Sequence, residues 1–128
     1  KLPNLHFPGY VDGAVLRTAY WGADCFFFPT YEETEGIVLL EALAARQNVL
    51  IRDIPIYEEW LEDGKNVYKA DSIDGFEEKL RGILEKKLPD LTEAGYAVAQ
   101  ERCIGAVGER LRSIYLETIE RVKGSSKK

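Results

Sequence analysis

The 128-residue chain contains no methionine, a single histidine and only two cysteines. Because methionine is missing even at position 1, we expect the chain to be a segment of a longer polypeptide. Cys25 and Cys103 lie far apart in a charged chain, which does not suggest a disulfide framework. Cys25 opens an apolar run and is expected to be a buried free thiol. His6 has no cysteine or second histidine to share a metal site, so we expect it to be structural.

Long apolar runs are also absent, since none approaches the roughly 18 residues that a membrane span needs. The N-terminal residues 1–4 lack the basic and apolar regions of a signal peptide. Apolar residues make up 45% of the chain and charged residues 30%, which favours a core with a water-exposed surface. The net charge of −5 mixes acidic and basic residues and argues against a nucleic-acid partner. We therefore expect a cytoplasmic protein that binds no nucleic acid.

Two patterns of apolar residues alternate along the chain. Residues 25–28 and 49–51 are unbroken apolar runs, typical of strands buried on both faces of a parallel sheet. Between such runs, apolar residues recur at helical spacing. We expect strands at 5–8, 25–28, 49–51 and 67–70, and helices at 14–22, 36–46 and 57–63. A further helix is expected to begin at Ile73 and to end before Pro89. This order predicts an α/β fold, an open parallel sheet flanked by helices on both faces.

The last third of the chain is expected to be wholly helical. Asp90 and Glu93 form a capping-box-like start, and Gly105 and Gly108 are expected to soften or break the run. A stripe of residues at helical spacing then predicts a long amphipathic helix with one packed face: Val107, Leu111, Ile114, Tyr115, Thr118 and Val122. We expect one domain over residues 1–123 and a disordered tail over 124–128.

The segment from Phe28 to Ala42 runs from the end of a predicted strand, through a loop, into a helix. Ligands bind at this edge of open α/β sheets. The first backbone N–H groups of a helix are unpaired, and the helix dipole favours an anion there. Thr34 is the expected N-cap. Gly36 falls in the first turn, where the lack of a side chain lets a phosphate or sugar touch the backbone.

Glu33 and Glu41 lie in this segment. Eight residues of helix span about 12 Å and turn some 80° off a common face, so the two carboxylates cannot converge as a catalytic pair. They can hold the two ends of an elongated ligand, or both can be solvated carboxylates on an acidic surface. The acidic residues at 32, 33 and 35 do not have calcium-loop spacing, so no metal site is expected.

Glu33 and Glu41 resemble the Glu-x7-Glu motif of the retaining glycosyltransferases of family 4, which have the two-domain GT-B fold. Residues 4–11 resemble the strand–glycine segment that lies upstream in that family, and residues 23–30 resemble its Ala-Asp-x-x-x-x-Pro-Ser stretch. The resemblance covers nearly the whole chain. It implies the Rossmann-like C-terminal half of a GT-B fold, with the first strands of that half missing.

The resemblance also implies roles for the motif. Glu33 would be catalytic, beside the transferred hexose, and Glu41 would hold the ribose hydroxyls of a nucleotide sugar. The backbone N–H groups of Glu35, Gly36 and Ile37 would bind sugar hydroxyls, and those of Ile37 and Val38 the diphosphate. Catalysis would then consist of stabilising the charge that develops on the leaving diphosphate. The resemblance implies no metal and no cofactor, the nucleotide sugar being a substrate.

The chain departs from the family pattern at two places. Glu35 stands where the family usually has an apolar residue, and residues 53–59 replace the usual Gly-Gly-x-x-Glu loop. Together with residues 62–66, that loop resembles a Gram-positive subgroup containing diacylglycerol glucosyltransferases. This resemblance implies glucose transfer from UDP-glucose to a membrane lipid, with the full-length protein peripheral at the inner face of the plasma membrane.

The chain lacks the glycine-bearing unit and the basic strand with which the donor domain of this family begins, and also the acceptor-binding domain. We therefore expect no transferase activity and at best weak nucleotide affinity from this polypeptide. The missing strands are expected to leave an open sheet edge that favours a homodimer.

Two other interpretations stay open. One is a receiver-like signalling module with Asp53 as the phosphorylated residue, although the chain has no N-terminal acidic pair. The other is a non-catalytic interaction domain built on half a Rossmann fold. Trp21 and Trp60 are able to stack on a base or a sugar, but they are more often packing residues.

Overall fold

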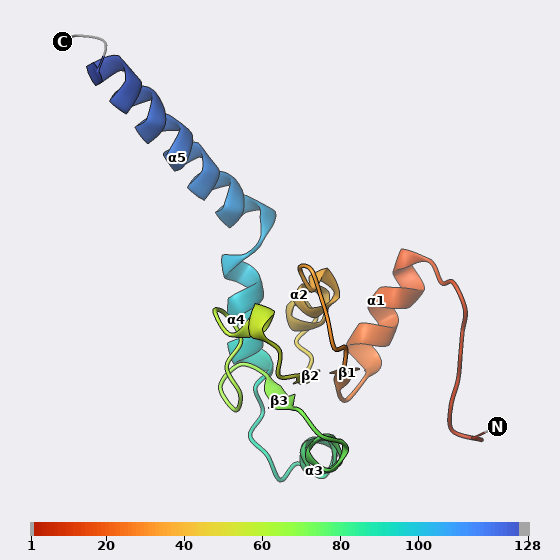
Figure 1. Cartoon of the computed structure of the whole chain (residues 1–128). Coiled ribbons are helices and arrows are strands. Elements are labelled where there is room, and N and C mark those ends of the chain that lie inside the picture. Colours follow the sequence, from red (N-terminus) through yellow and green to blue (C-terminus); the bar gives the residue numbers. More distant parts are fainter. Residues whose placement is uncertain (1, 126–128) are drawn as a thin grey trace.

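A computed structural model describes residues 2–125 of the chain (Figure 1). The helices are α1 (Gly13–Gly22), α2 (Ile37–Ala44), α3 (Ile73–Leu84), α4 (Thr92–Glu101) and α5 (Ile104–Ser125), and a short 3-10 turn, η1, covers Pro55–Tyr57. The strands β1 (Phe26–Phe28), β2 (Val49–Arg52) and β3 (Tyr68–Ala70) form one parallel sheet in the order β1-β2-β3. The predicted α/β class, with an open parallel sheet flanked by helices, is confirmed.

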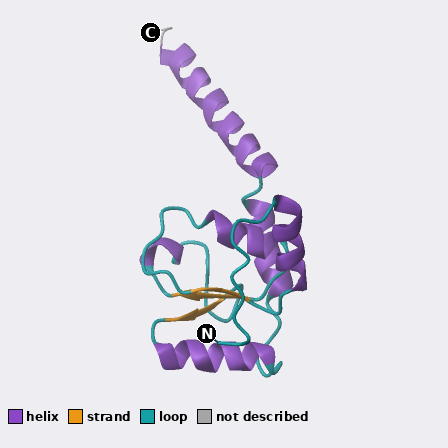
Figure 2. Ribbon diagram, turned by 90° about the vertical axis from the view of Figure 1, so that its right-hand side faces the viewer, coloured by secondary structure: helices purple, strands orange, loops and turns teal. Residues whose placement is uncertain are grey.

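The central strand β2 is buried on both faces, because its side chains alternate between two apolar clusters. Val49 and Ile51 pack with Leu39 of α2, whereas Leu50 packs with Phe76 of α3. Figure 2 shows the sheet edge on, with α3 along one side and the other helices on the opposite side. The unbroken apolar run at 49–51 therefore reflects a strand with helices on both faces, as predicted.

The starts of α1 and α3 follow from side-chain caps. The Asp12 carboxylate accepts the N–H groups of Ala14 and Val15, both at 2.9 Å. The Ser72 hydroxyl accepts the N–H of Gly75 at 3.2 Å. Each cap satisfies backbone donors that have no acceptor within their own helix, so both helices begin close to where the sequence predicts.

The predicted strand at residues 5–8 is wrong. The structure gives these residues no strand conformation, and the side chains of Leu5 and Phe7 are 51% and 85% exposed. A strand needs a hydrogen-bonding neighbour, and in the part of the chain that the structure describes, β1 is an edge strand that pairs only with β2.

The helix predicted at residues 57–63 is also wrong. The 3-10 turn η1 ends at Tyr57, and one further helical bond runs from the N–H of Leu61 to the carbonyl of Tyr57 at 2.8 Å. From Glu62 onward the side chain of Asn66 takes the place of helical hydrogen bonds. Its Oδ1 accepts the N–H of Glu62 at 2.8 Å, and its Nδ2 donates to the carbonyl of Trp60 at 3.3 Å. Gly64 completes this turn with a φ of 71°, a conformation that suits glycine.

The capping box predicted from Asp90 and Glu93 does not form. The Asp90 carboxylate accepts the N–H of Thr92 at 3.0 Å, which lowers the pKa of Asp90. The N–H of Leu91 is taken instead by the side chain of Asn48, at 3.1 Å. Glu93 pairs with Arg46 at 2.7 Å. Groups from the loop after α2 thus complete the start of α4.

The C-terminal helix α5 projects away from the rest of the molecule (Figures 1 and 2). The break before α5 falls at Arg102 and Cys103 rather than at the glycines, and Gly108 lies inside the helix. The predicted packed face is wrong for this chain, because Leu111 and Ile114 are 49% and 54% exposed. Helix α5 runs to Ser125, and residues 126–128 of the predicted tail lie outside the described residues.

Candidate functional site

Helix α2 opens at the carboxyl edge of β1 with an uncapped N-terminus. Its N-cap is Gly36, which is left-handed with a φ of 68°, and no side chain caps the helix. The prediction of Thr34 as the N-cap is therefore wrong. The first backbone donor with an acceptor in this turn is the N–H of Leu39, which bonds to the Gly36 carbonyl at 2.9 Å. The N–H groups of Ile37 and Val38 precede it, so helix geometry leaves them available to an anion.

Tyr57 closes the space beneath Gly36. A Cβ added to Gly36 would lie 3.2 Å from Cε1 of Tyr57 and 3.3 Å from Cδ1 of Leu39. Tyr57 itself is fully buried. Close packing and a positive φ both explain why glycine occupies position 36.

Two hydroxyls near this turn are buried without a hydrogen-bond partner in the described residues, those of Tyr57 and Thr30. The pKa of Tyr57 is raised, first by burial and second by the negative charge of Glu33. The Thr30 hydroxyl lowers the pKa of Tyr57, although the two hydroxyls do not meet hydrogen-bonding geometry. Glu33, in the loop before α2, therefore lies close enough to Tyr57 for its negative charge to raise the pKa of the phenol.

Glu41 faces helix α1. Its Oε2 accepts a hydrogen bond from the hydroxyl of Tyr20 at 3.2 Å. The pKa of Tyr20 is raised by burial, then by the charge of Glu41 and the hydrogen bond to it. A cavity of about 390 Å³ lies between the two helices, and its walls are Gly13, Leu16, Arg17, Tyr20, Trp21, Glu41, Ala44 and Ala45.

The predicted site residues thus fall into two groups. The loop and the first turn of α2 hold the half-buried Glu33, the exposed Glu35, the buried Gly36 and the exposed Ile37. Glu41 lies further along α2, beside the cavity that α1 lines. The roles that the resemblance implies for these residues, and the expectation of no metal and no cofactor, stay predictions.

Arg52, for which no role was predicted from the sequence, organises the same edge of the sheet. Its Nε donates to the carbonyl of Pro29 at 3.1 Å, and its Nη1 donates to the carbonyl of Asp71 at 2.8 Å. Its guanidinium lies 3.9 Å from the ring centroid of Tyr31. Arg52 therefore ties the loop that leads to α2 to the loop that follows β3. Its position directly after the apolar run at 49–51 is the sequence signal that could have revealed it.

Asp53, the candidate phosphorylation site of a receiver-like module, is engaged in an ion pair. Its carboxylate lies 3.1 Å from Nζ of Lys69, whose side chain is only 8% exposed. The pair links the residue after β2 to the middle residue of β3.

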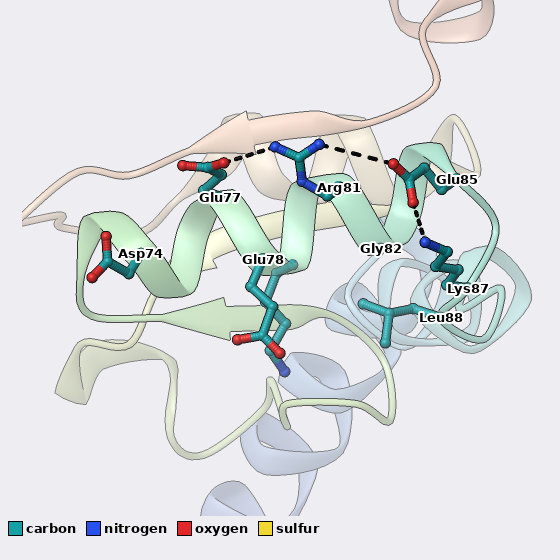
Figure 3. A pocket seen from close by; sticks show the side chains of 9 residues that line it. Asp74, Glu77, Glu78, Arg81, Gly82, Glu85, Lys87 and Leu88 are labelled. Atoms are coloured by element: carbon teal, nitrogen blue, oxygen red, sulfur yellow. Dashed lines mark hydrogen bonds and ion pairs between the residues drawn. The ribbon is translucent and has the colours of Figure 1, made fainter.

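A second cavity, of about 580 Å³, runs along the outer side of α3 (Figure 3). Arg81 pairs with Glu77 at 2.7 Å and with Glu85 at 3.9 Å, and Glu85 also pairs with Lys87. Figure 3 shows these four charged side chains joined to one another by ion pairs. None of the predicted site residues lines this cavity.

Comparison with known proteins points to one family. The profile described as "Glycosyl transferases group 1" matches residues 1–101. A processive diacylglycerol alpha-glucosyltransferase of Acholeplasma laidlawii is 45% identical over 120 residues, which cover 94% of this chain and 36% of that protein. An alpha-galactosylglucosyldiacylglycerol synthase of Streptococcus pneumoniae is 32% identical over 123 residues, 92% of this chain and 30% of that protein.

A phosphatidyl-myo-inositol mannosyltransferase of Mycolicibacterium smegmatis is 39% identical over 103 residues, 77% of this chain and 26% of that protein. The chain thus spans between 26% and 36% of the length of these three relatives. Among the described residues, no helix combines the length and apolar content that crossing a bilayer requires.

Proposed function

This chain belongs to the group 1 glycosyl transferase family, and from that premise we propose that it is the donor-binding part of a longer, retaining glycosyltransferase. The longer protein transfers a hexose from a nucleotide sugar to an acceptor. The observation that carries this proposal is the opening of α2 at Gly36. It presents the backbone N–H groups of Ile37 and Val38 at the carboxyl edge of the sheet, where α/β proteins bind anionic ligands.

Glu41 suits the ribose end of such a donor. It follows Ile37 by four residues, about 6 Å along the helix axis, and it lines the cavity between α1 and α2. One elongated ligand can therefore contact the first turn of α2 with its diphosphate and Glu41 with its ribose. In this arrangement the N–H groups of Glu35 and Gly36, with that of Ile37, bind hydroxyls of the hexose, and Glu33 lies beside that sugar.

The chemistry follows from this placement. When the bond between the sugar and the diphosphate breaks, negative charge develops on the departing oxygen. Fixed N–H groups and the positive end of the helix dipole stabilise that charge without having to reorganise. Such catalysis needs neither a metal nor a cofactor, and Glu33 is the side chain that we propose acts at the transferred sugar.

We propose glucose from UDP-glucose as the donor sugar and diacylglycerol as the acceptor. The support comes from the names of two relatives, the alpha-glucosyltransferase and the glycolipid synthase, and from residues 53–59, which depart from the usual family loop. The acceptor is held by a part of the longer protein outside this chain. The complete enzyme then works as a cytoplasmic protein, peripheral at the inner face of the plasma membrane.

We propose that the 128-residue chain is inactive alone, because it spans about a third of the length of its relatives. Incubation with UDP-glucose and diacylglycerol vesicles is expected to yield neither glycolipid nor free glucose above the level without protein. Turnover by the purified chain would contradict this part of the proposal. A longer polypeptide that carries the acceptor-binding part is the positive control.

The donor site is tested by changing Glu41. In the longer protein, Glu41→Ala is expected to weaken UDP-glucose binding about tenfold to hundredfold, because hydrogen bonds to a charged group are lost. Glu109→Ala on α5, where the exposed carboxylate lies 3.8 Å from Arg112, is the matched control and should leave affinity unchanged. Isothermal titration measures both. Unchanged affinity in the Glu41 variant would favour the non-catalytic interaction domain instead.

The exposed edge of β1 supports a proposed homodimer. Among the described strands, β1 has a neighbour on one side only, and Phe27 is 45% exposed. Unpaired strand edges favour pairing with a second chain. Light scattering should show a dimer that Phe27→Lys converts to a monomer, and a monomer at every concentration of the unmodified chain would rule the dimer out.

A further inference from the structure

We infer that Tyr20 is a positioning residue for Glu41, which it holds in the orientation that receives a ribose. The inference deepens the proposed function and rests on it. It starts from the hydrogen bond between the Tyr20 hydroxyl and Oε2 of Glu41 at 3.2 Å, which joins residues 21 positions apart in sequence and on different helices.

The ring of Tyr20 is anchored in the core. It lies 5.6 Å from the ring of Phe26 on β1, and Phe26 stacks on Phe28 with centroids 5.7 Å apart. Tyr20 also packs against the cluster of α2 and β2 side chains. An aromatic side chain held in this way has little rotational freedom, so its hydroxyl is a fixed donor at the surface of α2.

Glu41 needs such a partner. Glu41 is exposed, and among the described residues the hydrogen-bond partner of its carboxylate is the Tyr20 hydroxyl. A free glutamate on a helix surface samples several rotamers, and a ligand must overcome that entropy on binding. With Tyr20 in place, the carboxylate is ordered before the ligand arrives, which strengthens binding without a new ligand contact.

The hydrogen bond from Tyr20 also leaves the Glu41 carboxylate able to accept hydrogen bonds from a ligand. An ionised carboxylate offers about four acceptor positions on its two oxygens, and Tyr20 occupies one of them on Oε2. Oε1 therefore stays available for the adjacent hydroxyls of a ribose. Tyr20 and Glu41 both line the cavity of about 390 Å³ between α1 and α2, so a ligand that reaches Glu41 lies next to both residues.

The test compares two probes on the 128-residue chain, UDP and inorganic pyrophosphate, by NMR titration at millimolar concentrations. Pyrophosphate has no ribose and reports only on the start of α2. Tyr20→Phe is expected to weaken UDP binding about three- to tenfold and to leave pyrophosphate binding unchanged. In a Glu41→Ala background, which leaves no side-chain acceptor for the tyrosine hydroxyl, Tyr20→Phe should have no further effect. Tyr115→Phe, on α5 where the tyrosine is exposed, is the matched control.

The outcomes distinguish a failure of the ribose assignment from a failure of the role of Tyr20. If Glu41→Gln leaves UDP affinity unchanged, or if UDP does not shift the Glu41 resonances, the ribose assignment fails and the role of Tyr20 fails with it. If Glu41→Gln weakens UDP binding and Tyr20→Phe does not, the inference about Tyr20 alone is overturned. Equal losses for UDP and pyrophosphate in Tyr20→Phe would indicate a merely structural role, which also overturns it.

A measurement without ligand checks the contact itself, and it does not depend on the folding of the Tyr20 variant. Glu41→Gln removes the negative charge that helps to raise the pKa of Tyr20. NMR titration of the phenol should therefore show a lower pKa in Glu41→Gln than in the unmodified chain. An unchanged phenol pKa would mean that the hydrogen bond does not form in solution and would overturn the inference.

Discussion

Replacing Gly36 by alanine should destabilise the chain more than a left-handed backbone conformation alone explains. The φ of Gly36 is 68°, and a residue with a Cβ pays roughly 1–2 kcal/mol in that conformation. The new Cβ would also lie 3.2 Å from Cε1 of Tyr57 and 3.3 Å from Cδ1 of Leu39. Both side chains are fully buried and have little room to move, so overpacking adds about 1–3 kcal/mol.

The expected loss for Gly36→Ala is therefore about 2–5 kcal/mol. This is a large fraction of the roughly 5–15 kcal/mol by which a domain is usually stable. Gly64→Ala is a matched control, because Gly64 has a φ of 71° and no atom within 4 Å of an added Cβ. It should lose only the backbone cost, about 1–2 kcal/mol.

Urea unfolding, followed by circular dichroism and by tryptophan fluorescence, measures both variants. The fluorescence reports on this region because Trp60 lies 6.0 Å from the ring of Tyr57. If Gly36→Ala and Gly64→Ala lose equal free energy of unfolding, the packing between Gly36 and Tyr57 carries no weight and the reasoning about this turn is wrong. The same substitution should weaken pyrophosphate binding, because the backbone that presents the N–H groups of α2 must shift.

Three further predictions concern other parts of the chain. Cys103 is exposed and Cys25 is half-buried, and burial raises the pKa of Cys25 to about 11. Alkylation at pH 8 followed by mass spectrometry should therefore label Cys103 first. Equal alkylation rates for the two cysteines would contradict the burial of Cys25. Leu111→Ala on the exposed α5 should change the free energy of unfolding by less than about 0.5 kcal/mol, whereas Leu43→Ala in the core should cost about 2–5 kcal/mol in the same denaturation assay. The pKa of Asp90 is lowered by the hydrogen bond from the start of α4, so the stabilising effect of this carboxylate is present above its unfolded pKa, near 3.9, and is lost as the pH falls through its lower folded pKa. The stability difference between the unmodified chain and Asp90→Ala should therefore shrink in acid. A difference that does not depend on pH would refute this prediction.

Much of the fold was predictable because burial leaves a pattern along the chain. The run at 49–51 is apolar without alternation because helices cover both faces of β2. The helix at 73–84 was predictable from the spacing of Phe76 and Ile83, which are its buried residues. The predicted strand at 5–8 failed because strand formation depends on a neighbour, which no local pattern reports.

The candidate site was predictable in part. The strand–loop–helix order and Gly36 indicated an opening helix at the sheet edge, and the structure places Gly36 there as the N-cap. The partners of the site residues were beyond sequence reasoning. Tyr57 lies 21 residues after Gly36, and Tyr20 lies 21 residues before Glu41, so neither contact has a local signal. Arg52 was missed because its hydrogen bonds run to the backbone of two other loops.

The sequence by itself determined the class of fold, the alternation of strands and helices from α1 to β2 and from β3 to α3, and the segment in which the candidate site lies. These depend on which residues prefer burial and on helix and strand periods, both of which are local properties. The tertiary structure alone decided that Tyr20 reaches Glu41, that Tyr57 closes the space under Gly36, and that the apolar stripe of α5 stays exposed. Each of these depends on which surfaces come into contact when the chain packs. The contacting residues are far apart in sequence, so the local sequence does not reveal them.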